Sequence, residues 1–239
     1  MSNPSAKVLI VVTNADQYEK AGYRTGLWLG ELTHFYDVVT EAGLDVVVAS
    51  PKGGKIPIDP ESLLFSELGE SMGVQGPVSK RYQDREFMRL LDDTQKLADL
   101  SASEFDAIYL TGGHGTMFDF PSSDDLATLT AAMYESGKIV SAVCHGPAGL
   151  LGVKLAGGAA LVQGKRVTGF SWNEEKLAKR AEVVPFSLEG ELQNRGGVYE
   201  KALLPFAPHV VEDGRLVTGQ NPNSAHGVAE RVVAQLRAK

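Results

Sequence analysis

The chain has 239 residues and a single cysteine, Cys144, so an intrachain disulfide cannot form. A protein without disulfides suits a reducing compartment. Long apolar runs are also missing: about eighteen apolar residues, the length that spans a bilayer, occur nowhere in succession. The first seven residues form a short polar lead without the apolar core of a secretory signal. We therefore expect a cytoplasmic protein with no membrane segment.

Blocks of basic residues are missing as well, and the formal net charge is −7. Because nucleic acids and anionic membranes attract basic surfaces, we expect neither as a partner. The cysteine and histidine spacings of structural metal sites are absent, and the glycine-rich run Gly112–Gly115 matches neither the dinucleotide nor the P-loop pattern. The sequence thus predicts no metal and no other cofactor.

What the chain does contain is an alternation of short buried strands and amphipathic helices. Lys7–Thr13 and Asp45–Ser50 are predicted strands, and Thr25–Ala42 between them carries apolar residues at helical spacing. Strand, helix and strand in this order form a βαβ unit, which predicts a parallel sheet. Further predicted strands cover residues 107–110, 139–143 and 215–218, and further predicted helices cover 81–100, 123–136, 173–179, 189–196 and 224–238. We expect one α/β domain over residues 1–239, with a doubly wound, mostly parallel sheet and helices on both faces.

Two stretches depart from this alternation. Residues 52–102 begin rich in Gly and Pro, then become charged and helical, and contain no clear apolar strand. We expect a helical insertion there that covers one end of the sheet. Residues 161–168 are predicted to form a β-ribbon that turns at Gly164 and Lys165.

Cys144 lies where the predicted strand Ile139–Val143 breaks into a helix. Gly146 is free to adopt unusual dihedral angles, and Pro147 suits the first helical turn. This pattern is typical of a nucleophile elbow, and the positive end of the following helix would favour the thiolate. The alternative is that Cys144 is a small buried apolar residue, the commonest fate of a lone cysteine.

Glycine-rich or reactive residues follow three of the predicted strands, at the edge of the sheet where α/β proteins bind ligands. The N–H groups of Gly112 and Gly113 could line an oxyanion site, or the pair could form a plain tight turn. His145 could assist Cys144 through its N–H or its ring, or could be a turn residue without a role. The third such feature is Thr218–Pro222.

Three acidic residues are candidates for acid–base chemistry. Glu31 lies within the apolar face of the first predicted helix, where it is either solvated at the edge or buried with a raised pKa. Glu174 and Glu175 begin a predicted helix, and stabilising its dipole is a sufficient explanation for one of them. Side chains that could line a pocket, but for which packing is an equally good explanation, are Trp28, Phe118, His114 and His226.

Taken together, these residues resemble the ThiJ/PfpI superfamily, which has a flavodoxin-like fold. The narrower resemblance is to its branch of heat-inducible holding chaperones and glutathione-independent glyoxalases (glyoxalase III). The matching segments, in order and over nearly the whole chain, are Thr25-Gly26 with Glu31, Thr111–Pro121, Ala142–Pro147, Val167–Phe170 with Glu175, and Arg215–Pro222.

The resemblance implies a role for each matching residue. Cys144 would be the nucleophile, Glu31 the acid that contacts its sulfur, and His145 the partner base. Glu175 would be the third member of the triad, with Glu174 close enough to take its place. The backbone N–H groups of Gly113 and His145 would form the oxyanion hole.

The implied reaction is the cofactor-free conversion of methylglyoxal, a small α-oxoaldehyde, to lactate through a hemithioacetal on Cys144. Protein deglycase activity could accompany it. One alternative is a stress-response holding chaperone that binds unfolded or glycated proteins; another is a redox sensor whose thiol oxidises. A cysteine peptidase or amidase is a further alternative, which an insertion that narrows the cleft disfavours. The resemblance also implies a homodimer.

Overall fold

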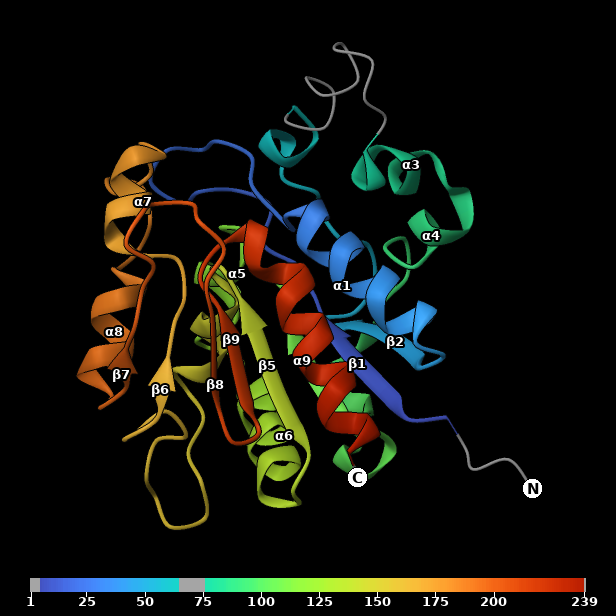
Figure 1. The fold of residues 1–239 in the computed structure, drawn as a ribbon. Coiled ribbons are helices and arrows are strands. Elements are labelled where there is room, and N and C mark those ends of the chain that lie inside the picture. Colours follow the sequence, from blue (N-terminus) through green and yellow to red (C-terminus); the bar gives the residue numbers. More distant parts are fainter. Residues whose placement is uncertain (1–4, 65–75, 239) are drawn as a thin grey trace.

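The computed structural model describes residues 5–64 and 76–238. Its strands are β1 Lys7–Val11, β2 Asp45–Ser50, β3 Gln95–Lys96, β4 Ala107–Leu110, β5 Ile139–Val143, β6 Arg166–Val167, β7 Val198–Tyr199, β8 Val210–Asp213 and β9 Leu216–Gly219. The described residues form a seven-stranded sheet in the order β3-β2-β1-β4-β5-β9-β8 (Figure 1). All neighbours in it are parallel except β8 and β9. This order confirms the predicted flavodoxin-like, mostly parallel sheet.

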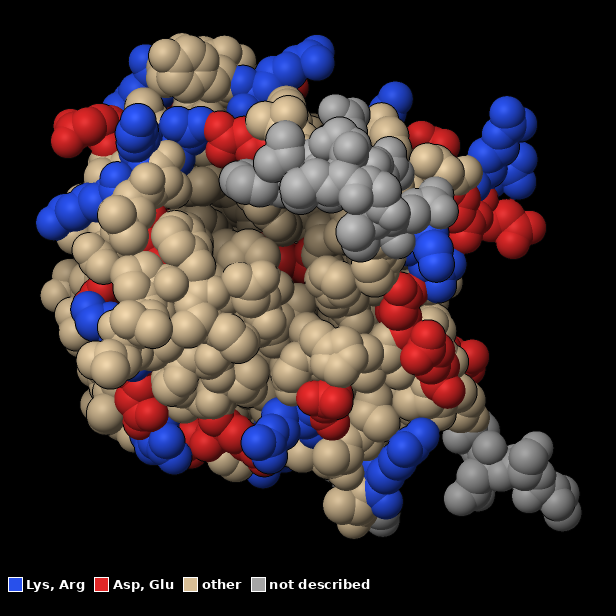
Figure 2. All heavy atoms as spheres, turned by 45° about the horizontal axis from the view of Figure 1, so that its top comes forward, with Lys and Arg blue, Asp and Glu red and all other residues tan. Residues whose placement is uncertain are grey.

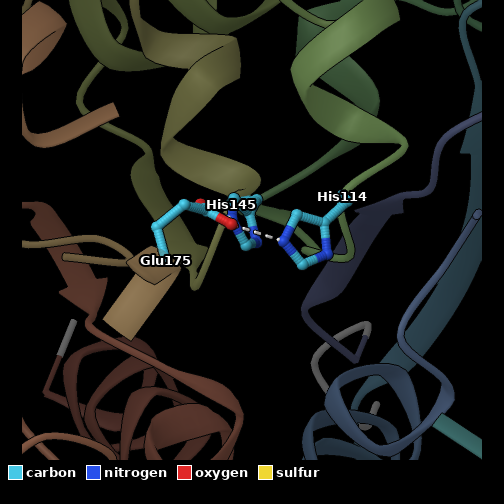
Figure 3. A group of neighbouring side chains, drawn as sticks. All are labelled: His114, His145 and Glu175. Carbon is cyan, nitrogen blue, oxygen red and sulfur yellow. Dashed lines mark hydrogen bonds and ion pairs between the residues drawn. The ribbon is translucent and has the colours of Figure 1, made fainter. Parts of the chain in front are cut away.

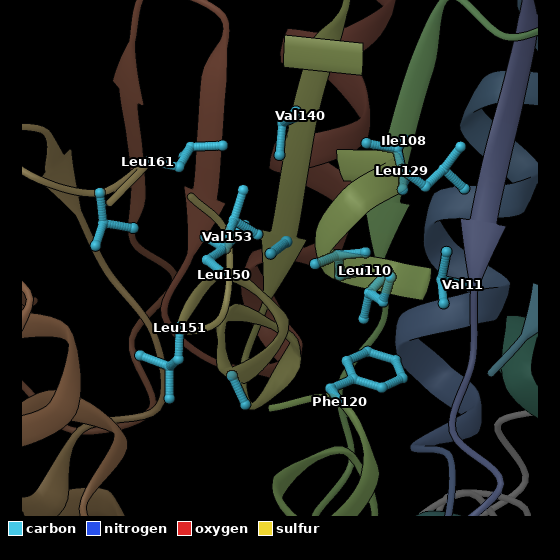
Figure 4. Close-up of a cluster of buried hydrophobic side chains, with 14 of the residues drawn as sticks. Val11, Ile108, Leu110, Phe120, Leu129, Val140, Leu150, Leu151, Val153 and Leu161 are labelled. Carbon is cyan, nitrogen blue, oxygen red and sulfur yellow. The ribbon is translucent and has the colours of Figure 1, made fainter. Parts of the chain in front are cut away.

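Both faces of the sheet are buried, because side chains along each strand alternate between two cores. In β1, Leu9 and Val11 belong to one apolar cluster, whereas Val8 and Ile10 belong to the other. Figure 4 shows part of the first cluster, in which side chains from β1, β4 and β5 meet Phe120 and the segment after β5. The sheet is therefore the middle layer of three.

Helices form the two outer layers, as predicted. The helices are α1 Leu29–Glu41, α3 Pro77–Gln83, α4 Arg85–Arg89, α5 Thr116–Asp119, α6 Asp124–Glu135, α7 Trp172–Leu177, α8 Leu188–Asn194 and α9 Ala225–Arg237. Helices α1 and α9 pack side by side on one face, and α6 packs on the other (Figure 1). Of the helices in the described residues, none combines the length and apolar character needed to span a bilayer.

The first predicted helix begins later than its apolar pattern suggested. Residues 25–28 are extended rather than helical, because Leu27 pairs with the segment after β2: its N–H donates to Pro57 O, and its carbonyl accepts from Asp59. Helix α1 therefore starts at Leu29. This places Glu31 in the first turn, at the edge of the sheet where the strands end.

The prediction of one helix over residues 81–100 was wrong. Asp84 ends α3 and caps α4 by accepting hydrogen bonds from the N–H groups of Glu86 and Phe87. The chain then forms β3, which pairs with the end of β2 and extends the sheet. Both residues of β3 are exposed, so no apolar pattern marked it as a strand. The predicted insertion at 52–102 stays a prediction, since its residues 65–75 lie outside the described residues, as do residues 1–4 of the polar lead.

The predicted β-ribbon at 161–168 was also wrong. Gly164 does occupy a turn, with φ of 72°, but the residues before it form no strand. Instead β6 pairs in parallel with β7. Arg166 lies opposite Val198, which is thirty-two residues later in the chain. A pairing between segments so distant leaves no local signal in the sequence.

Candidate active site

Cys144 directly follows β5 and has a strained backbone conformation. Its φ is 56°, a region that residues other than glycine rarely adopt, and such strain concentrates at functional sites. The N–H of Cys144 donates to Gly219 O at 2.9 Å and holds the turn against β9. A Cβ at Gly146 would lie 2.2 Å from Leu110 O, so only glycine fits there. The predicted elbow is therefore present, although the helix that follows it is a 3₁₀ helix, Gly146–Leu150.

The side chain of His145 turns back toward the thiol and links it to Glu175. Its Nδ1 lies 3.3 Å from Cys144 Sγ, and its Nε2 lies 2.9 Å from Oε2 of Glu175. Glu175 comes from α7, so two segments distant in sequence complete a Cys–His–Glu chain. Burial by itself raises the pKa of Glu175, but the charge that His145 carries when protonated and the hydrogen bonds with His114 and His145 hold this pKa well below its usual range. The carboxylate can therefore stabilise a proton on His145.

A second histidine shares the same carboxylate. His114 Nε2 lies 2.8 Å from Oε1 of Glu175, and Figure 3 shows the rings of His114 and His145 beside its carboxyl group. Burial, and after it the neighbouring His145, lowers the pKa of His114, so this ring stays neutral and donates through Nε2. Its Nδ1 is buried and has no hydrogen-bond partner among the described residues. The sequence marked His114 only as a residue that could line a pocket, and it does line the cavity. Its link to Glu175 was not predicted, although its position in a loop at a strand's carboxyl end was a usable signal.

Glu174 has different hydrogen-bond partners from the adjacent Glu175. It is fully buried, caps α7 through Ser171, and accepts hydrogen bonds from Gln220, Asn221 and the backbone N–H of Phe206. Among the described residues it forms no hydrogen bond or ion pair with His114 or His145. Of the two acids that the sequence left open, the geometry brings only Glu175 to His145.

Glu31 is the acid on the other side of the sulfur. Its residue is fully buried, and Oε2 accepts a 2.6 Å hydrogen bond from the N–H of Gly112. Burial raises the pKa of Glu31 to about 8, although hydrogen bonds with Cys144 and Gly112 work against the rise. At neutral pH the group therefore carries a proton. Its Oε1 has no partner among the described residues, which leaves a buried acid able to serve a substrate.

The expectation of a thiolate favoured by a helix N-terminus was wrong. Burial, and after it the charge of Glu31, raises the pKa of the Cys144 thiol above its usual range. The residue is only 3% exposed, and a short 3₁₀ helix supplies too small a dipole to offset desolvation. The thiol therefore needs a base to take its proton, and His145 is placed to do so.

One of the two predicted oxyanion donors is already used. The N–H of Gly112 donates to Glu31, so Gly112 holds the acid rather than a substrate oxygen. The N–H groups of Gly113 and His145 have no acceptor among the described residues, and both residues line the cavity above the sulfur. Gly113 has φ of 101°, and a Cβ there would lie 2.2 Å from Gly26 O. These two N–H groups are the donors that the site can offer.

The other side chains that could line a pocket, Trp28, Phe118 and His226, differ in whether they reach the cavity. Trp28 lines the cavity, whereas Phe118 packs edge-on against Tyr18, with ring centroids 5.9 Å apart. His226 lies on α9 with its side chain 60% exposed and does not line the cavity. Trp28 is thus the only one of these three beside the reactive groups of the described structure.

One group of side chains has metal-ligand chemistry. Candidate ligand atoms of His114, His145 and Glu175 all lie within 4.8 Å of one another, and histidine with carboxylate is a common zinc set. Both carboxylate oxygens already accept from the imidazoles, however. A metal bound here would compete for the atoms that link Glu175 to His145.

Comparisons with known proteins place the whole chain beside proteins of one family. The sequence model of the DJ-1/PfpI family matches residues 25–235. Glyoxalase 3 of Candida albicans is 32% identical, over 95% of this chain and 97% of its own length. The structure of the 24 kDa rapid encystment protein of Francisella tularensis has a TM-score of 0.88 and 35% identity, covering 97% of this chain and 99% of that one. Glyoxalase III from Candida albicans has a TM-score of 0.83 and 30% identity, covering 96% of both chains.

Proposed function

The chain belongs to the DJ-1/PfpI family, and we propose that it is a glutathione-independent glyoxalase that converts methylglyoxal to lactate without a cofactor. One observation carries the proposal: a base and a protonated acid flank the same sulfur. His145 Nδ1 lies 3.3 Å from Cys144 Sγ, and burial raises the pKa of Glu31, on the other side, to about 8. A thiol between a base and an acid suits addition to a carbonyl followed by proton transfer.

The first step is addition of the thiol to the aldehyde. His145 takes the thiol proton as Sγ bonds to the aldehyde carbon, and Glu175 stabilises the resulting imidazolium. The carbonyl oxygen becomes an oxyanion, which the N–H groups of Gly113 and His145 can receive. The imidazolium then returns its proton to that oxygen. The product is a neutral hemithioacetal on Cys144.

The second step moves hydrogen between the two substrate carbons. His145 removes the hydrogen of the former aldehyde carbon while Glu31 donates its proton to the neighbouring carbonyl oxygen, which gives an enediol. His145 then protonates the second carbon, and the Glu31 carboxylate takes the hydroxyl proton of the first. The first carbon is oxidised to a thioester and the second is reduced to an alcohol, so no external oxidant is needed. Water hydrolyses the thioester to lactate and restores the thiol of Cys144.

The test is lactate formation from methylglyoxal in the absence of glutathione. Cys144→Ala and Cys144→Ser should abolish it while leaving the fold intact, and Glu31→Gln should abolish it by removing the acid proton. A further variant, His145→Gln, removes the proposed base. Its matched control is His226→Gln, because His226 is exposed on α9 and outside the cavity. Lactate production that persists in the Cys144 variants would rule the proposal out.

The geometry of the site disfavours one alternative function, the redox sensor, and the others need experiments of their own. A redox sensor needs an accessible thiol with a low pKa, whereas Cys144 is 3% exposed and burial raises its pKa. Holding-chaperone and deglycase activities stay predictions, and aggregation suppression that survives Cys144→Ala would separate a chaperone from the enzyme. The peptidase or amidase alternative is tested by offering peptides of increasing length beside methylglyoxal. A homodimer and a cytoplasmic location also stay predictions, the former open to light scattering.

A further inference from the structure

The cavity above Cys144 is far larger than methylglyoxal requires. Its volume is about 850 Å³, within the roughly 300–1,000 Å³ of pockets that hold drug-sized ligands. Figure 2 shows the hollow in this face of the molecule, with a wall made mainly of uncharged residues. Its large apolar side chains are those of Trp28, Leu64, Val78, Phe170, Leu177 and Phe206. No Lys or Arg is among the described lining residues, so a large anionic ligand is not matched by charge.

Phe206 in this lining has a backbone that a bulky residue rarely adopts. Its φ is 62°, in the left-handed region that favours glycine. Two other non-glycine residues have positive φ in the described chain: Cys144 lines the same cavity, and Lys179 directly follows Ala178, which also lines it. Such strain persists only where surrounding contacts impose it, and it concentrates around ligand sites.

The contacts that impose the strain on Phe206 are visible. Its N–H donates to Oε1 of Glu174 at 2.7 Å, and its carbonyl accepts from Nδ2 of Asn223 at 2.8 Å. Glu174 is itself fully buried and held by Ser171 and Gln220. Because Glu174 precedes Glu175 on α7, the same helix turn positions Phe206 and the carboxylate that serves the catalytic histidine.

The ring of Phe206 continues an aromatic wall that starts at the reactive groups. The centroids of His145 and Phe170 are 4.5 Å apart, and those of Phe170 and Phe206 are 6.1 Å apart. Phe206 is nevertheless 39% exposed. An apolar ligand in the cavity would cover the exposed part of this ring, which the strained backbone holds in the lining.

We propose that Phe206 and Phe170 form an apolar subsite that selects α-oxoaldehydes with a substituent bulkier than methyl, such as a long alkyl chain. This inference rests on the proposed glyoxalase function and names its preferred substrate class. The aldehyde carbon would meet Cys144, and the chain on the neighbouring carbonyl would lie along the two rings. Each further methylene placed in such a subsite leaves water and strengthens binding.

The test is a series of unbranched alkylglyoxals, from methylglyoxal to hexylglyoxal, assayed without glutathione. The members have similar carbonyl reactivity, so differences in kcat/KM report on the apolar substituent. In the wild type, kcat/KM should rise about two- to fourfold with each of the first few methylenes. In Phe206→Ala this dependence on chain length should flatten, whereas Phe206→Leu, which restores apolar bulk, should keep much of it.

Leu203→Ala is the control, because Leu203 is 96% exposed in the same loop and does not line the cavity. It should reproduce the wild-type dependence on chain length. If methylglyoxal is turned over but kcat/KM stays flat or falls along the series, the subsite is overturned and the proposed function stands. The same holds if Phe206→Ala leaves the dependence of kcat/KM on chain length unchanged. Turnover of no glyoxal at all would overturn the proposed function and the subsite with it.

Discussion

The N–H of Gly112 donates a 2.6 Å hydrogen bond to Oε2 of Glu31. Gly112 lies in the loop after β4, and Glu31 lies in the first turn of α1, so the bond joins this loop to α1 at the edge of the sheet where Cys144 follows β5. A Cβ at Gly112 would lie 2.5 Å from that oxygen and 2.9 Å from the Cβ of Cys144. Glycine at this position therefore determines where the acid stands relative to the sulfur.

Gly112→Ala should consequently displace the Glu31 carboxyl group and impair catalysis. A displacement of about 1 Å in an active site lowers kcat on the order of a hundredfold, and forcing a methyl group into this space should also destabilise the fold by about 1–3 kcal/mol. Measuring kcat/KM and thermal unfolding together separates the two effects. Gly157→Ala is the matched control, because a Cβ there meets nothing within 4 Å. Full activity in Gly112→Ala would contradict this role.

Glu31→Gln should change how stability depends on pH. Burial raises the pKa of Glu31 from 4.5 to about 8, so between these values the folded state binds a proton that the unfolded state has lost. Wild-type stability therefore falls as pH rises through this window, by on the order of 4 kcal/mol from this group. Gln cannot ionise and can still accept from Gly112, so the variant should gain stability relative to the wild type as pH rises from 5 to 8.

Urea unfolding at several pH values measures this difference, and other titrating groups cancel between the two proteins. Glu230→Gln is the control, because the side chain of Glu230 is 62% exposed. Parallel stability curves for the wild type and Glu31→Gln would mean that Glu31 is ionised in the folded protein. The proposed acid role would then be lost.

Glu174→Gln and Glu175→Gln should fail in different ways. Glu175→Gln should lower kcat about a hundredfold or more, because it weakens the support of a protonated His145. Glu174→Gln should lower stability by about 2 kcal/mol, because an amide NH₂ would face the N–H donors that Glu174 now satisfies. Unfolding free energies and kcat for both variants provide the comparison, and equal loss of kcat in the two would contradict the assignment.

Zinc should inhibit the enzyme, and chelators should not. His114, His145 and Glu175 offer a zinc-type ligand set within 4.8 Å, and a bound ion would remove the base and its carboxylate from the reaction. Lactate formation should fall on adding micromolar Zn²⁺, recover with EDTA, and be unchanged by EDTA alone. Activity that EDTA abolishes and zinc restores would contradict the cofactor-free mechanism.

Local sequence patterns predicted the elements that are continuous and buried. Strands β1, β4 and β5 are runs of apolar, mostly branched residues bounded by turns, and the amphipathic helices α6 and α9 lie within about two residues of their predicted bounds. The failures were β3, β7, β8 and the pairing of β6, in which short length, exposure or distant pairing leaves no periodic signal.

By itself the sequence determined that Cys144 stands at the end of a buried strand, because an apolar run followed by His-Gly-Pro can only end sharply there. It also placed Glu31 and the Glu174–Glu175 pair among the reactive candidates. Only the tertiary structure decided which of those adjacent acids meets His145, since neighbouring residues of a helix point in different directions and the rotation of α7 is set by its packing. The same packing turned Gly112 toward Glu31, brought His114 onto the shared carboxylate, and held Phe206 in its strained conformation over the cavity.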